Sequence, residues 1–283
     1  MVKIEPDGPR FCKHVLPVSA AMITGYRTLH IQEAKYTRTA LEAMPDAVAT
    51  WYRYLTLYDR TLRREHEWPE DEPSDAYWSW TVRLNLASGA LATAKLTLDA
   101  ALAGYYSQAY GLLRHMAETW KQMVYLRLNE QAAKQWFSPD GLTPAQEPSQ
   151  GTILRGIRRL GKAEFGLLEN LDIVEDRISG LNKGAHPSGL MMAQVSTEIA
   201  GMRQLGANVD RGLLGNVMSL GTVFMALLLR EIEHIVPADA AWQTEFDSIG
   251  KERNEWHKAE IGEEPSDDAH RSAAQNGGPQ ETS

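Results

Sequence analysis

The residues best suited to chemistry are Arg114, Glu118 and His186, which lie in two separate segments. Arg114 and Glu118 are four residues apart in GLLRHMAETWKQ, so on a helix they share a face and can pair. Helical projection turns this face, which also carries Lys121 and Tyr125, away from the apolar stripe. The face is then either a solvated ion pair of small energetic value, or the wall of a cleft. In a cleft, Glu118 would hold Arg114 for an anionic ligand or orient His186.

His186 stands directly before Pro187 in LNKGAHPSG, where a helix is expected to end. A residue before proline favours an extended backbone, and Gly184 is a natural helix terminator. The imidazole would then either cap the helix end or stand exposed, as a group for acid–base or phosphate chemistry near neutral pH. Lys183 beside it suits an anionic substrate.

The two segments together resemble a bacterial and phage-associated family of helical proteins of unknown function. That family pairs a helix carrying Leu-Leu-Arg, three residues and Glu with a Leu-Asn or Leu-Ser segment leading to a His-Pro-Ser turn. The resemblance covers residues from about 80 to 235 and implies Arg114, Glu118 and His186 as site residues. The layout is similar to HEPN-type domains, some of which are metal-independent ribonucleases of defence and toxin systems.

The sequence departs from the hallmark of HEPN ribonucleases, an arginine and a histidine with four to six residues between them at one helix. Arg177 and His186 are too far apart for this spacing. The pairs Arg230/His234 and Arg253/His257 are too close, and Arg60/His66 spans a predicted helix end. The resemblance therefore transfers only Arg114, Glu118 and His186, and it weakens the ribonuclease hypothesis.

A basic helix is the second candidate site. In GTILRGIRRLGK the four bases fall within about 100° of helical arc, with Leu154, Ile157 and Leu160 outside it. These bases are Arg155, Arg158, Arg159 and Lys162. They form either an ordinary solvated face or a phosphate or RNA contact face, although no aromatic residue interleaves with them.

Metal and cofactor signatures are weak. Glu231 and His234 have the Glu-x-x-His spacing of di-iron bundles, but a second such unit is missing from the part of the sequence expected to fold. Phosphate-cradling glycine loops, zinc-binding His-Glu-x-x-His and nucleophile-elbow motifs are also missing. We therefore predict no metal site and no cofactor.

The elements that must position these residues are amphipathic helices with short connections. Helical spacing of apolar residues predicts helices over 45–64, 76–103, 107–128, 151–162, 163–183, 213–235 and 239–260. The helix at 76–103 is apolar around most of its circumference, which is typical of a central helix, and it should pack antiparallel to 107–128. The helix at 163–183 carries an apolar stripe that runs from Phe165 to Leu181. The fold class predicted is an all-α antiparallel bundle with a small β-hairpin near residues 191–209.

Three divisions of the chain follow. We expect an irregular N-terminal arm over 1–31, a helical bundle over 32–260 and a disordered acidic tail over 261–283. Gly212 to Leu229 is a run of 18 residues without charge, long enough to span a membrane. Its polar residues and glycines favour a buried core helix instead, so no membrane association is expected.

The bulk composition fits a cytoplasmic protein. Cys12 is the only cysteine and the N-terminus lacks an apolar signal region. The net charge of −8 comes largely from two acidic segments, 67–75 and 262–283, so the rest of the chain is near neutral. Two functions remain: a non-enzymatic interaction or regulatory module, such as a homodimer formed through the long apolar helices, and a HEPN-like protein acting on RNA.

Overall fold

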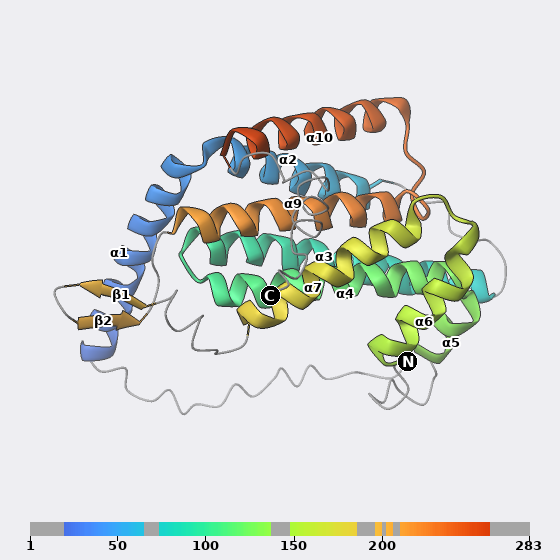
Figure 1. Ribbon diagram of the computed structural model, residues 1–283, viewed down its shortest axis with the longest axis horizontal. Coiled ribbons are helices and arrows are strands. Elements are labelled where there is room, and N and C mark those ends of the chain that lie inside the picture. Colours follow the sequence, from blue (N-terminus) through green and yellow to red (C-terminus); the bar gives the residue numbers. More distant parts are fainter. Residues whose placement is uncertain are drawn as a thin grey trace, which may run out of the picture.

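The molecule is an all-α bundle in which most helices lie side by side, roughly along its long axis (Figure 1). The computed structural model describes residues 20–64, 74–136, 148–185, 196–199, 202–205 and 210–260. Its side chains are described over 30–64, 74–133, 148–181 and 210–260. The predicted fold class is thereby confirmed.

Two antiparallel helices form the centre, as the sequence predicts. They are α3 (Asp75–Leu102) and α4 (Tyr106–Leu128), which pack along their length. Gly104 takes a left-handed backbone with φ of +83°, and it allows the tight turn between them. Polar residues of α3 are exposed at Ser88, Lys95 and Asp99, while most of the remaining circumference of this largely apolar helix is covered.

Further helices surround this pair. They are α2 (Pro45–Leu62), α5 (Glu130–Trp136), α6 (Gln150–Leu160), α7 (Leu167–Ala185), α9 (Arg211–Ile232) and α10 (Ala240–Glu260), with a short 3-10 turn, η2 (Gly161–Ala163). In Figure 1, α9 lies between the α2/α10 layer and the α3/α4 layer. Polar side chains fix three of the helix starts: Ser74 caps α3, Ser149 caps α6 and Asp210 caps α9.

Helix α9 is the apolar segment whose membrane-spanning length the sequence raises. It is long and apolar enough to cross a membrane, but 61% of its most apolar window is buried inside the protein. Its buried face packs on α4, α2 and α3. At its closest approach to α2, Gly221 lies against the ring of the fully buried Trp51. This burial is that of a core helix.

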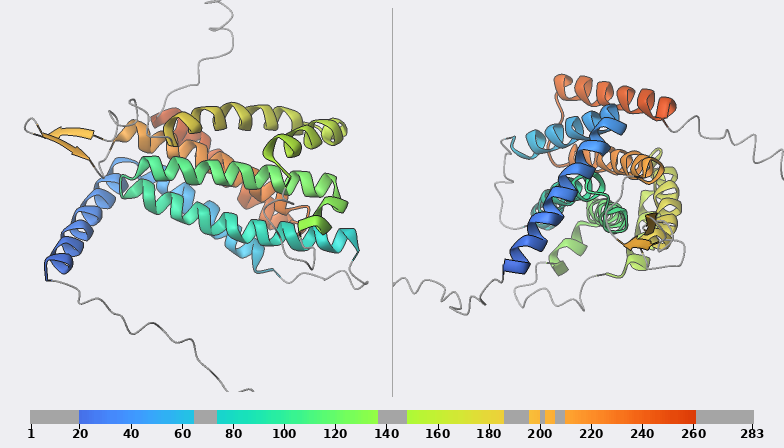
Figure 2. Two further views of the ribbon diagram at one scale, coloured as in Figure 1. Left: turned by 90° about the horizontal axis from the view of Figure 1, so that it is seen from below. Right: turned by 90° about the vertical axis from the view of Figure 1, so that its left-hand side faces the viewer.

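The N-terminal arm expected over residues 1–31 contains the start of a long helix. Helix α1 (Ala20–Ala43) begins inside the span 1–31 expected to be an irregular arm. Figure 2 shows α1 leaving the bundle obliquely, and Ala40 is its only buried residue among those with described side chains. Helix α1 packs so little on the bundle that its apolar residues do not form the continuous buried stripe by which the other helices are predicted.

Helix α7 differs from its prediction at both ends. It begins at Leu167, after Gly166 with a left-handed φ of +74°, so Phe165 is outside the helix and fully exposed instead of belonging to its apolar stripe. At the other end the helix continues through Gly184 to Ala185, so Gly184 does not terminate it. Glycine weakens a helix by about 1 kcal/mol, and packing along the stripe outweighs that.

The predicted hairpin is present within residues 191–209. Strand β1 (Ser196–Ile199) pairs antiparallel with β2 (Met202–Leu205), and Ser196 lies opposite Leu205. The expected acidic tail, 261–283, lies outside the described residues.

Candidate functional site

The polar face of α4 is turned inward. The Lys121 side chain is only 4% exposed, and its Nζ lies 2.6 Å from Oε1 of Glu175 on α7. One turn further, the ring of Tyr125 lies against Gly156 of α6, so closely that any side chain at that position would meet the ring. Around Lys121 and Tyr125 the face is therefore packed against α7 and α6 and is not solvated.

Arg114 and Glu118 continue this face toward the start of α4. The Nε of Arg114 donates to Oε1 of Glu118 at 2.8 Å, and the side chains are 40% and 22% exposed. Partial burial reduces solvent screening, so this pair is held more firmly than a fully solvated one. The contact with Glu118 uses only the Nε of Arg114, so the guanidinium keeps further N–H groups for an incoming anion.

The end of α7 lies at the level of this pair. The start of α7 lies beside the end of α4, because Gly161 is close to both Leu167 of α7 and Leu128 of α4. Two turns later, Glu175 of α7 pairs with Lys121, which is nearer the start of α4. Helix α7 therefore runs antiparallel to α4. Continuing this register brings the last turn of α7, ending in Ala185, to the turn of α4 that carries Arg114. His186 and the Lys183 side chain lie outside the described residues.

The basic helix α6 lies elsewhere. It contacts α4 near Tyr125, about 16 Å along the helix axis from Arg114. The bases of the predicted basic helix are all exposed: Arg155, Arg158 and Arg159 on α6, and Lys162 in η2. Arg158 is paired with Asp172 of α7, with 2.6 Å between Nη2 and Oδ1. The structure therefore does not bring the basic face and the Arg114–Glu118 pair into one cleft.

A buried ionic cluster is the feature that sequence reasoning missed. Oε1 of Glu231 accepts hydrogen bonds from Nη2 of Arg83 at 3.2 Å and from Nε of Arg127 at 2.7 Å. Arg127 also donates to both carboxylate oxygens of Glu164, each at 2.8 Å. The cluster thus ties α3, α4 and α9 to the segment before α7. The signal available was an acidic residue placed two positions beyond the long charge-free run, directly after Arg230.

Burial sets the electrostatics of this cluster. It raises the pKa of Glu231, against the opposing charges of Arg127 and Arg83. Burial, followed by the charges of Arg127 and Arg83, lowers the pKa of His234. Glu231 is thus occupied by arginines, and in the described part of the chain no three His, Cys, Asp or Glu side chains gather as a metal would require.

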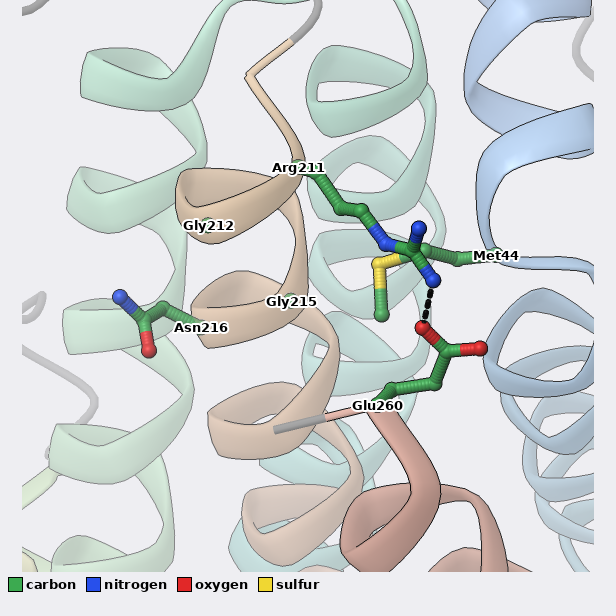
Figure 3. Close-up of a pocket in the computed structure, with 6 residues that line it drawn as sticks. All are labelled: Met44, Arg211, Gly212, Gly215, Asn216 and Glu260. Carbon is green, nitrogen blue, oxygen red and sulfur yellow. Dashed lines mark hydrogen bonds and ion pairs between the residues drawn. The ribbon is translucent and has the colours of Figure 1, made fainter. Parts of the chain in front are cut away.

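A small cavity lies where α9 begins and α10 ends (Figure 3). It has a volume of about 360 Å³. Its lining residues come from the α1–α2 junction, α9 and α10: Met44, Arg211, Gly212, Gly215, Asn216 and Glu260. Arg211 and Glu260 form an ion pair in it, so the arginine that lines it is neutralised. None of the predicted site residues whose side chains are described lines this cavity.

Comparison with known proteins gives no relative. No family model, no curated protein and no solved structure matches this chain.

Proposed function

We propose that the protein is a non-enzymatic interaction and regulatory module that works as a homodimer through α1. The observation that supports this proposal is the uncovered surface of α1. Ile31, Ala34 and Leu41 are exposed there, and with Arg38 they lie at intervals of three, four and three residues, the spacing of a helix–helix seam. Ile31 is 71% exposed and Leu41 is 39% exposed.

The stability of α1 points the same way. In proteins most helix stability comes from tertiary packing, and over the part of this 24-residue helix whose side chains are described that packing is slight. Within one chain, α1 has an ion pair of His30 with Glu33 and a hydrogen bond from the Tyr105 hydroxyl to Glu33, both near its middle. A second α1 against the Ile31–Leu41 stripe would supply the missing apolar cover.

The homodimer is tested by the mass of the particle in solution. We expect the wild type to be a dimer and the double variant Ile31→Glu/Leu41→Glu to be a monomer, because paired glutamates in the seam repel. Size-exclusion chromatography with light scattering measures the mass, and circular dichroism checks the fold. Ile173→Glu, at an exposed apolar position on α7, is the control and should remain a dimer. A monomeric wild type, or a dimeric double variant, would contradict the proposal.

A second candidate function is supported by the geometry of α4 and α7: a HEPN-like protein that cuts RNA without a metal. The half-buried Arg114–Glu118 pair lies at the level where α7 ends, and His186 is the residue that follows Ala185. In this hypothesis Arg114 holds a phosphate, Glu118 holds Arg114, and His186 moves a proton.

Cleavage of RNA in excess chelator tests this second function. We expect the wild type to cut and His186→Ala to be slower by about 100-fold or more, the usual contribution of general acid–base catalysis. Arg114→Ala should also lose activity, whereas Arg63→Ala, which breaks an exposed Arg–Asp pair on α2, should not. A wild type that leaves RNA intact, or a His186→Ala variant as active as wild type, overturns the hypothesis.

A further inference from the structure

The corner between α6 and α7 carries three bases in a row and an exposed aromatic ring. Arg155 and Arg159 lie one turn apart on α6, and Lys162 follows in the short 3-10 turn η2 directly after the helix. Phe165 follows three residues after Lys162. We call these four residues the α6–α7 corner; all four side chains are exposed.

Phe165 is exposed because of the local backbone. Gly166 takes a left-handed φ of +74°, which ends the connection and starts α7 one residue later at Leu167. Leu167 enters the core at 5% exposure, and Phe165 is left wholly in solvent. A fully exposed phenylalanine has no role in the core, so both faces of its ring are available to a partner. The sequence places this ring in the α7 stripe, so the bases seemed to lack an aromatic partner.

The positive charge of the α6–α7 corner is not neutralised by Asp172 and Glu164 near it, because those acids pair with other arginines. Asp172 is engaged by Arg158, and Glu164 is held by both terminal nitrogens of Arg127. Within the described ranges, Arg155 donates to the hydroxyl of Thr152, and neither Arg159 nor Lys162 forms an ion pair. Glu169 on α7 is exposed, and its negative charge would repel a phosphate on the α7 side of Phe165. We therefore expect phosphates to lie on the α6 side of the ring.

We propose that the α6–α7 corner binds single-stranded nucleic acid, with a base stacked on Phe165 and phosphates on Arg155, Arg159 and Lys162. A positive track beside an exposed ring is the arrangement by which single strands are held without sequence preference. A duplex keeps its bases stacked within itself and cannot use the ring. The proposal rests on nucleic-acid contact, as in the second candidate function, but it does not require cleavage.

Fluorescence anisotropy with labelled 12-nucleotide oligouridine and oligothymidine, at low salt, tests the proposal on the full chain. Phe165→Ala is expected to weaken binding by about 5- to 150-fold, the loss of one stacked base. Phe165→Leu keeps an apolar side chain and should weaken binding similarly, whereas Phe165→Trp should bind like the wild type. Ile173→Ala, at another exposed apolar position, is the control and should change nothing.

The three bases are tested together by the salt dependence. The triple variant Arg155→Ala/Arg159→Ala/Lys162→Ala should lower the slope of log affinity against log salt by about 2, because each phosphate contact on a single strand contributes about 0.7. All of these positions are on the surface, so thermal unfolding should be unchanged. Uridine and thymidine strands bound alike support a base-and-phosphate site, and a preference for one identifies RNA or DNA as the ligand.

Several results would overturn the proposal. They are a wild type that binds neither strand at low salt, a duplex bound more tightly than the single strand, and a Phe165→Leu variant that binds like the wild type. Binding to phosphatidylglycerol vesicles or polyglutamate in place of the oligonucleotides would assign the corner to another partner. Arg114→Ala and His186→Ala should bind the oligonucleotides like the wild type, because these residues are not part of the α6–α7 corner. A wild type that binds single strands but does not cleave RNA would contradict the ribonuclease function and would leave the proposal for the corner standing.

Discussion

Glu231→Gln is expected to lower the free energy of unfolding by about 3–5 kcal/mol, measured by urea denaturation. The carboxylate is 4% exposed and is hydrogen-bonded to Arg83 and Arg127. Glutamine keeps the shape but removes the negative charge, which leaves Arg83, itself only 7% exposed, without its counterion. A buried charge that loses its partner keeps its full desolvation cost, and this cost is the source of the expected loss.

The control is Glu233, two residues after Glu231 at the end of α9. Glu233 pairs with Arg230, whose side chain is 45% exposed, so Glu233→Gln should cost less than about 1 kcal/mol. If Glu231→Gln lost no more than Glu233→Gln, the cluster would be no structural tie between α3, α4 and α9. The Nε of Arg83 has no hydrogen-bond partner among the described residues. Loss of the Glu231 carboxylate would therefore leave this buried guanidinium with still fewer hydrogen-bond acceptors.

The helices could be predicted where one face is buried. For α2, α3, α4 and α9, the apolar residues recur with the helical period because they meet a neighbouring helix, and the boundaries observed lie within a few residues of those predicted. For α1 the same argument fails, because a helix that leaves the bundle carries no apolar face toward it. Phe165 shows the limit at a boundary: periodicity alone extends a stripe across a glycine turn.

The candidate site could be predicted only in part. Spacing within α4 is enough to pair Arg114 with Glu118, because four residues make one helical turn. The partners of Lys121 and Glu231 come from other helices, and their distances depend on how those helices pack, which one sequence does not encode locally. For the same reason the distance between the basic helix and Arg114 became known only from the fold.

Gly221→Ala is expected to destabilise the protein by about 3 kcal/mol or more, the upper part of the range for overpacking a core. A Cβ atom at this position would lie 1.9 Å from Cη2 and 2.2 Å from Cζ3 of Trp51. Trp51 is fully buried and its ring is rigid, so relief requires α2 and α9 to separate. Thermal and urea unfolding of the purified variant measure the loss.

The matched control for this change is Gly89→Ala on the exposed face of α3, where no atom lies within 4 Å of a new Cβ. Because alanine favours a helix interior over glycine, this variant should be more stable than the wild type by about 0.5–1 kcal/mol. If Gly221→Ala fails to fold, Trp51→Phe/Gly221→Ala keeps the test open. A smaller ring relieves the contact, so the double variant should be more stable than Gly221→Ala alone. Equal effects of alanine at positions 221 and 89 would mean that α2 and α9 do not approach as closely as Trp51 and Gly221 require.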